Sequence, residues 1–180
     1  MDEASLRKLL AEFKSGAITL EDSLKALKSL PFEDLGFAKI DHHRALRCGF
    51  PEVIFCPGKT NAQIMAIAQR IVSRGQNLLA TRVSPEAMAS MVDLFSDAQV
   101  NEAARTVAVV RKPRTPAPGV IAVVCAGTSD LPVAEEARVT CEVMGNKTAN
   151  LYDVGVAGIH RLLGYTGQLQ SANVIIVVAG

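Results

Sequence analysis

The sequence predicts an α/β fold, and three observations support that prediction. Residues 120–125 form a continuous, valine-rich apolar run, as expected for a strand buried on both faces of a parallel sheet. Two further apolar strands, 148–152 and 173–178, alternate with segments of helical character. Hydrophobic residues make up 49% of the chain but aromatic residues only 4%, so small aliphatic side chains are expected to fill closely packed layers.

Residues 1–32 are predicted to form a helical hairpin. Apolar residues recur at helical spacing before Gly16, whose conformational freedom suits the end of a helix. Thr19 and Asp22 have the spacing of a capping box at the start of a second helix, and Pro31 is expected to end it. We expect this hairpin to serve packing or oligomerisation rather than chemistry.

Residues 33–112 are predicted to form a small α/β domain with the order βαβαβ. The expected strands lie at 53–56, 78–81 and 107–110. One helix is expected to follow Thr60, with its buried face at Ile64, Ile67, Ala68 and Ile71. A second begins at Ser84-Pro85, since proline is favoured in the first turn of a helix.

A proline-rich stretch separates this domain from the rest of the chain. Residues 111–119 read RKPRTPAPG, and prolines hold the chain extended, so 113–119 are interpreted as a linker. Residues 120–180 then form the second domain, a flavodoxin-like sheet in three layers. A half-sheet of three strands that ends on an apolar strand is incomplete as a domain, so the sequence predicts a chain truncated after Gly180.

The loops that follow these parallel strands are predicted to meet at one edge of the sheet, where open α/β sheets bind ligands. The first loop contains Gly127, Thr128, Ser129 and Asp130 at the start of a helix. Glycine permits close approach of a ligand, and free N–H groups at a helix start favour phosphate. Asp130 is a candidate for ribose binding or proton transfer; an ordinary helix cap is the equally weighted alternative.

The second loop carries Gly155 and Gly158, followed by His160 and Arg161. His160 is a candidate acid or base near neutral pH, with a surface or capping role as the alternative. Arg161 is a candidate for binding the substrate.

The remaining motifs give weaker signals. Pro57-Gly58-Lys59-Thr60 lacks the upstream glycine of a P-loop, so a nucleoside triphosphatase is excluded, and Lys59 stays a candidate phosphate contact. His42 and His43 beside Asp41 form a poor chelate, and no metal site is predicted. The four cysteines, including Cys48, form no CxxC pair and are expected to be reduced and mostly buried thiols.

Composition also limits the partners and the location of the chain. A formal net charge of +1 and few aromatic residues argue against a nucleic-acid partner. No apolar run reaches membrane-spanning length, and the charged N-terminus is unlike a signal peptide. We therefore expect a cytoplasmic protein that acts on a small molecule and does not associate with a membrane.

Two sets of segments resemble known families. AGTSDLPVAEEA, DVGVAGIHRLL and VIIVVAG resemble the core of aminoimidazole ribonucleotide carboxylases of purine biosynthesis. DLGFAKIDHHRALRCGFPEVIFCPGKT is similar to the N-terminal region of the pyridinium-biscarboxylic acid mononucleotide synthases, which serve nickel-pincer nucleotide biosynthesis. The combined resemblance covers residues 33–180.

The resemblance implies an enzyme that carboxylates the pyridinium ring of nicotinic acid adenine dinucleotide and hydrolyses its phosphoanhydride, releasing AMP. It also implies carbon dioxide or bicarbonate as co-substrate, assistance by magnesium, and a homo-oligomer, an octamer in the family. The family's ring-attacking cysteine follows the third strand of this sheet, and none of the four cysteines here is assigned that role. The alternatives are a carboxylase or mutase that acts on aminoimidazole ribonucleotide, and a protein that binds nucleotide without turnover.

Overall fold

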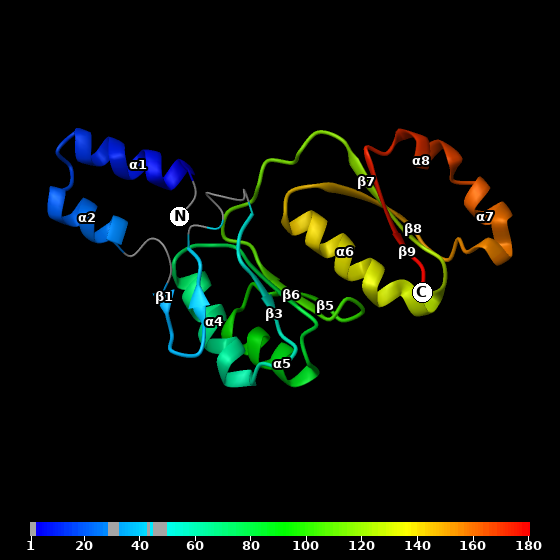
Figure 1. Ribbon diagram of the computed structural model, residues 1–180, viewed down its shortest axis with the longest axis horizontal. Coiled ribbons are helices and arrows are strands. Elements are labelled where there is room, and N and C mark those ends of the chain that lie inside the picture. Colours follow the sequence, from blue (N-terminus) through cyan, green and yellow to red (C-terminus); the bar gives the residue numbers. More distant parts are fainter. Residues whose placement is uncertain (1–2, 29–32, 43, 45–49) are drawn as a thin grey trace.

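A single helix, α6 (Leu131–Val143), lies between two small β-sheets in the computed structural model (Figure 1). The structure describes residues 3–28, 33–42, 44 and 50–180. One side of α6 packs on a three-stranded sheet and another side packs on a four-stranded sheet. The fold class is α/β, as predicted. The domain limits at 32 and 113–119 stay predictions.

The N-terminal hairpin consists of α1 (Glu3–Lys14) and α2 (Leu20–Lys28), which lie side by side at one end of the molecule (Figure 1). Gly16 follows α1 with a φ of 76°, a left-handed conformation that glycine adopts without strain. The Thr19 hydroxyl oxygen accepts a hydrogen bond from the Asp22 N–H at 3.1 Å, so the predicted Thr19 cap is present. The expected stop at Pro31 lies outside the described residues.

The four-stranded sheet has the order β3-β4-β6-β5, and helices α4 and α5 cover one face of it. A separate antiparallel pair joins β1 to β2. The bounds of these elements are β1 Glu33–Asp34, β2 Lys39–Ile40, β3 Val53–Phe55, α4 Asn61–Ser73, β4 Leu78–Thr81, α5 Pro85–Leu94, β5 Gln99–Asn101 and β6 Thr106–Val109.

Both predicted helix starts in this region are confirmed by their caps. The Thr60 hydroxyl accepts from the Gln63 N–H at 3.3 Å, and the Gln63 side chain accepts from the Thr60 N–H at 3.0 Å. The Ser84 hydroxyl accepts from the Ala87 N–H at 3.2 Å, with a proline in the first turn of α5. Each side chain satisfies an N–H group that has no partner within its own helix.

The predicted order βαβαβ omits the short pair β1 and β2, and within the four-stranded sheet it omits β5. β5 is short and largely polar, so it lacks the apolar run by which the other strands were recognised. It forms an antiparallel hairpin with β6, which reverses the chain. As a result β6 runs antiparallel to β4, whereas β3 and β4 are parallel.

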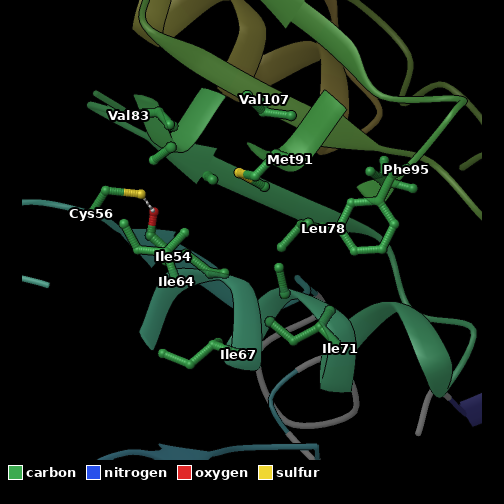
Figure 2. Close-up of a cluster of buried hydrophobic side chains, with 14 of the residues drawn as sticks. Ile54, Cys56, Ile64, Ile67, Ile71, Leu78, Val83, Met91, Phe95 and Val107 are labelled. Carbon is green, nitrogen blue, oxygen red and sulfur yellow. Dashed lines mark hydrogen bonds between the residues drawn. The ribbon is translucent and has the colours of Figure 1, made fainter. Parts of the chain in front are cut away.

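The main core lies between the four-stranded sheet and its two helices (Figure 2). Ile71 from α4, Leu78 from β4 and Met91 from α5 are all fully buried and face one another across this layer. The four apolar positions expected on the buried face of α4 are the four residues that the helix buries. Burial of this aliphatic surface provides the main stabilisation of this half of the molecule.

The three-stranded sheet is parallel throughout and has the order β8-β7-β9, as in a flavodoxin-like fold. Val123 and Cys125 of β7 face α6, while Ala122 and Val124 face the opposite layer with α7 and α8. The bounds are β7 Val120–Cys125, β8 Lys147–Leu151, α7 Ile159–Leu163, α8 Thr166–Ser171 and β9 Val174–Val178. The three-layer prediction is therefore confirmed, with β8 starting one residue earlier than expected.

None of the helices in the described part of the chain combines the length and apolar character needed to cross a bilayer.

Candidate functional site

The loops after β7 and β8 are bonded to each other at the carboxyl edge of the three-stranded sheet. The Gly155 N–H donates to the Ala126 carbonyl at 2.8 Å, and the Val154 N–H donates to the Cys125 carbonyl at 3.1 Å. The Ala126 N–H in turn donates to the Val178 carbonyl at the end of β9, at 3.0 Å. The strand ends thus meet at one edge, where ligands bind in this class of sheet.

Gly155 is required by this close contact between the loops. A Cβ atom at position 155 would lie 2.8 Å from the carbonyl oxygen of Ala126, closer than real Cβ atoms approach backbone oxygens. The φ of Gly155 is −61°, so the requirement comes from space rather than from backbone strain.

Replacement of Gly155 with alanine is expected to lower the free energy of unfolding by about 1–2 kcal/mol, because the two loops must separate to admit the methyl group. The free energy is measured by urea unfolding followed by circular dichroism. Gly167→Ala is the matched control: nothing lies within 4 Å of its Cβ position, in the first turn of α8. That variant is expected to be neutral or slightly stabilising, and equal effects at both positions would contradict the assignment.

The first loop forms a 3₁₀ turn, Thr128–Asp130, that leads directly into α6. The carboxylate of Asp130 turns back and accepts from the Gly127 N–H at 2.9 Å, and this residue is only 9% exposed. Asp130 is the N-cap residue of α6, but its side chain makes no hydrogen bond into that helix and instead closes the 3₁₀ turn onto Gly127. The side chains of Thr128 and Ser129 are exposed at the start of the helix.

The second loop presents Arg161 through an ion pair with Asp153. Asp153 has a φ of 57°, which turns the chain sharply after β8. The Arg161 side chain lies over Gly158, where a Cβ atom would meet its Nε at 2.6 Å. His160 is exposed at the start of α7.

Lys59 lies in the turn after β3, a strand of the four-stranded sheet. The other candidate residues lie at the carboxyl edge of the three-stranded sheet. The Lys59 ammonium group donates to the Phe55 carbonyl at 2.6 Å and so closes its own turn. The structure does not bring it together with the loops after β7 and β8.

The described residues do not by themselves form a magnesium site. In the ranges that the structure describes, no three His, Cys, Asp or Glu side chains gather as metal ligands. Asp130 and Asp153, the carboxylates of the two loops, are already engaged by Gly127 and Arg161. His42 is buried with its Nε2 3.1 Å from Glu33, and His43 lies outside the described residues. We assign no step to a metal.

Two of the thiols are buried beneath the strand ends. Cys125 lies under the first loop, with its sulfur 3.6 Å from the Gly127 carbonyl. Burial raises the pKa of the Cys56 thiol to about 11, which disfavours the thiolate needed for nucleophilic attack. Burial likewise raises the pKa of Cys141, and Cys48 lies outside the described residues.

Sequence reasoning missed a group of charged and polar residues on α6 that contacts the other sheet. Glu135 accepts from Asn101 of β5 at 2.6 Å and from the Tyr152 hydroxyl at 2.6 Å. Glu136 pairs with Arg82 at 3.3 Å. Spacing gave no signal, because acidic residues early in a helix are common and usually face solvent. Beside this group, a groove of about 260 Å³ runs between β5, β6 and α6.

Two comparisons place the chain among known proteins. Residues 32–112 match the family model of the LarB/PurE-like N-terminal domain. An uncharacterized protein of Methanocaldococcus jannaschii is 36% identical over 185 residues, which cover 98% of this chain and 72% of that protein. The family identity agrees in its broad form with the resemblance seen in the sequence. The chain belongs to the LarB/PurE-like family, a carboxylase-related family of enzymes.

Proposed function

We propose that this chain supplies the nucleotide-binding edge of a carboxylase that acts on nicotinic acid adenine dinucleotide. The observation that carries the proposal is the contact between the loops after β7 and β8, which gathers Thr128, Ser129, Asp130 and Arg161 along one sheet edge. Family membership supports carboxylation as the type of reaction.

The proposed binding mode uses groups that are exposed at this edge. The hydroxyls of Thr128 and Ser129 and the N–H groups at the start of α6 suit a phosphate. The Arg161 guanidinium, fixed by Asp153 and partly exposed, suits a second phosphate oxygen. Oδ2 of Asp130 holds the Gly127 N–H, and Oδ1 is proposed to accept from a ribose hydroxyl.

The proposed reaction begins with addition of a thiolate, assigned to none of the four cysteines of this chain, to the electron-poor pyridinium ring. A ring carbon of this adduct then forms a bond with carbon dioxide, supplied directly or as bicarbonate; that carbon loses its proton, and the thiolate leaves to restore the pyridinium. His160, an exposed imidazole beside this edge, is proposed to take up that proton. Water then cleaves the phosphoanhydride, so that AMP leaves and the carboxylated mononucleotide remains. The protein is proposed to work as a homo-oligomer.

Aminoimidazole ribonucleotide is the second candidate substrate. It too carries a ribose and a phosphate, and the two loops that meet at this edge are those that resemble its carboxylases. Titration calorimetry with each compound, followed by competition between them, decides which one binds. AMP release in the presence of bicarbonate is then measured. Absence of binding by both compounds at millimolar concentration would overturn the proposal.

Replacement of Asp130 with asparagine is expected to weaken binding of nicotinic acid adenine dinucleotide by about tenfold. The reason is that the Gly127 N–H and the ribose hydroxyl lose a charged hydrogen-bond acceptor. The affinity is measured by titration calorimetry. Asp93→Asn, at an exposed position of α5 on the other sheet, is the control and is expected to leave the affinity unchanged. An equal loss in both variants would argue against a nucleotide site at the first loop.

A further inference from the structure

We propose that Glu135 is a positioning residue, through which the four-stranded sheet fixes the loop that follows β8. Its carboxylate is the point where α6, β5 and the end of β8 meet. Only the consequence for substrate affinity rests on the proposed function, since the contacts themselves are independent of it.

Glu135 binds donors from three directions. Oε1 accepts from the Tyr152 hydroxyl at 2.6 Å and from Nε of Arg138 at 2.9 Å. Oε2 accepts from the Asn101 amide at 2.6 Å and from Nη2 of Arg138 at 2.7 Å. The Glu135 side chain is only 15% exposed, so water competes little for these bonds.

Tyr152 connects this carboxylate to the candidate site. It is the first residue after β8 and directly precedes Asp153, the partner of Arg161. Its ring packs in the cluster of Val123 and Cys125. The hydroxyl bond to Glu135 therefore fixes the chain where the second loop departs, two and three residues before the amides of Val154 and Gly155 that bind the first loop.

Asn101 connects the same carboxylate to the four-stranded sheet. Its amide nitrogen donates to Glu135, while its amide oxygen accepts from the Ala104 N–H at 2.9 Å in the turn between β5 and β6. The position of this hairpin is thus transmitted to α6 and, through the shared carboxylate, to Tyr152.

Glu136 provides a matched comparison on the same helix. It also joins α6 to the other sheet, through an ion pair with Arg82 at 3.3 Å, and the Arg82 side chain is 48% exposed. The Tyr152 hydroxyl donates to Glu135 and not to Glu136. Removal of the Glu136 charge therefore weakens the contact between the sheets without releasing the loop.

The test is amide hydrogen exchange of Val154 and Gly155, followed by NMR in the intact chain. Tyr152→Phe and Glu135→Gln are each expected to speed exchange at these two amides about tenfold, because a bond to a charged acceptor is lost. Asn101→Asp places a second carboxylate against Glu135 while it keeps the acceptor for Ala104, and it is expected to act in the same direction. Glu136→Gln is expected to leave exchange unchanged.

Unchanged exchange in Tyr152→Phe and Glu135→Gln would overturn the proposal, as would an equal increase in Glu136→Gln. No effect of Asn101→Asp would overturn the link from the four-stranded sheet. Affinity for nicotinic acid adenine dinucleotide, measured on the same variants, is expected to fall in parallel with the faster exchange. If the unaltered chain binds no nucleotide, the proposed function fails, while the exchange data still decide the role of Glu135.

Discussion

Replacement of Ile71 with alanine is expected to lower the free energy of unfolding by about 3–4 kcal/mol. Ile71 is fully buried on α4, where it faces Leu78 of β4 and the side chains of α5 (Figure 2). The truncated side chain leaves a cavity that strands and helices on both sides cannot readily close. Both the lost burial of aliphatic surface and this cavity contribute to the cost.

Urea unfolding followed by circular dichroism measures this change. Ile71→Val removes a single methylene group from the same position and is expected to cost about 1 kcal/mol. Val92→Ala, on an exposed face of α5, is expected to change stability by less than about 0.5 kcal/mol. A cost below about 1 kcal/mol for Ile71→Ala would show that this layer is not the core that stabilises the four-stranded sheet.

Acidification is expected to remove roughly 3 kcal/mol of stability through Glu135 alone. The pKa of Glu135 is lowered to about 2, mainly by hydrogen bonds from Arg138. Partial burial raises this pKa, and hydrogen bonds from Tyr152 and Asn101 lower it further. In the unfolded chain its pKa returns to the ordinary value of 4.5. The unfolded state therefore binds the proton first, so this stabilisation is complete above about pH 5 and is lost as the pH falls toward 2.

Comparison of the chain with Glu135→Gln isolates this contribution. Between pH 6 and pH 3 the unaltered chain is expected to lose about 2 kcal/mol more than the variant, measured by urea unfolding at each pH. Glu136→Gln, which keeps Glu135 in place, is expected to lose stability in parallel with the unaltered chain. Identical pH dependence in the chain and in Glu135→Gln would show that the carboxylate is not held by these donors.

The sequence predicted those features that depend on residues close together in the chain. Thr60 and Ser84 cap helices three residues away, and the buried face of α4 repeats at helical spacing, so each was visible locally. The valine-rich run of β7 likewise indicated a strand buried on both faces of its sheet. The meeting of the first two loops followed from the parallel order of β7 and β8.

Features that depend on long-range contacts were not predictable in this way. β5 forms because β6 pairs with it, and its own residues carry no apolar run. The bond from Asn101 to Glu135 joins residues 34 positions apart, and no spacing rule connects an amide in a hairpin with an acid in a later helix. Lys59 was grouped with the nucleotide loops by its chemistry, whereas its place on the other sheet is decided by the pairing of β3 with β4.

The position of α6 between two sheets affects how the molecule unfolds. Many helices expose one face to solvent, whereas α6 packs against a sheet on each of two sides. If either sheet came apart, the other would lose part of its cover on that side. Heating is therefore expected to produce one cooperative transition rather than two. Cleavage of the chain within residues 113–119 and separation of the two halves would expose to solvent the face of α6 and the face of the four-stranded sheet that now pack together.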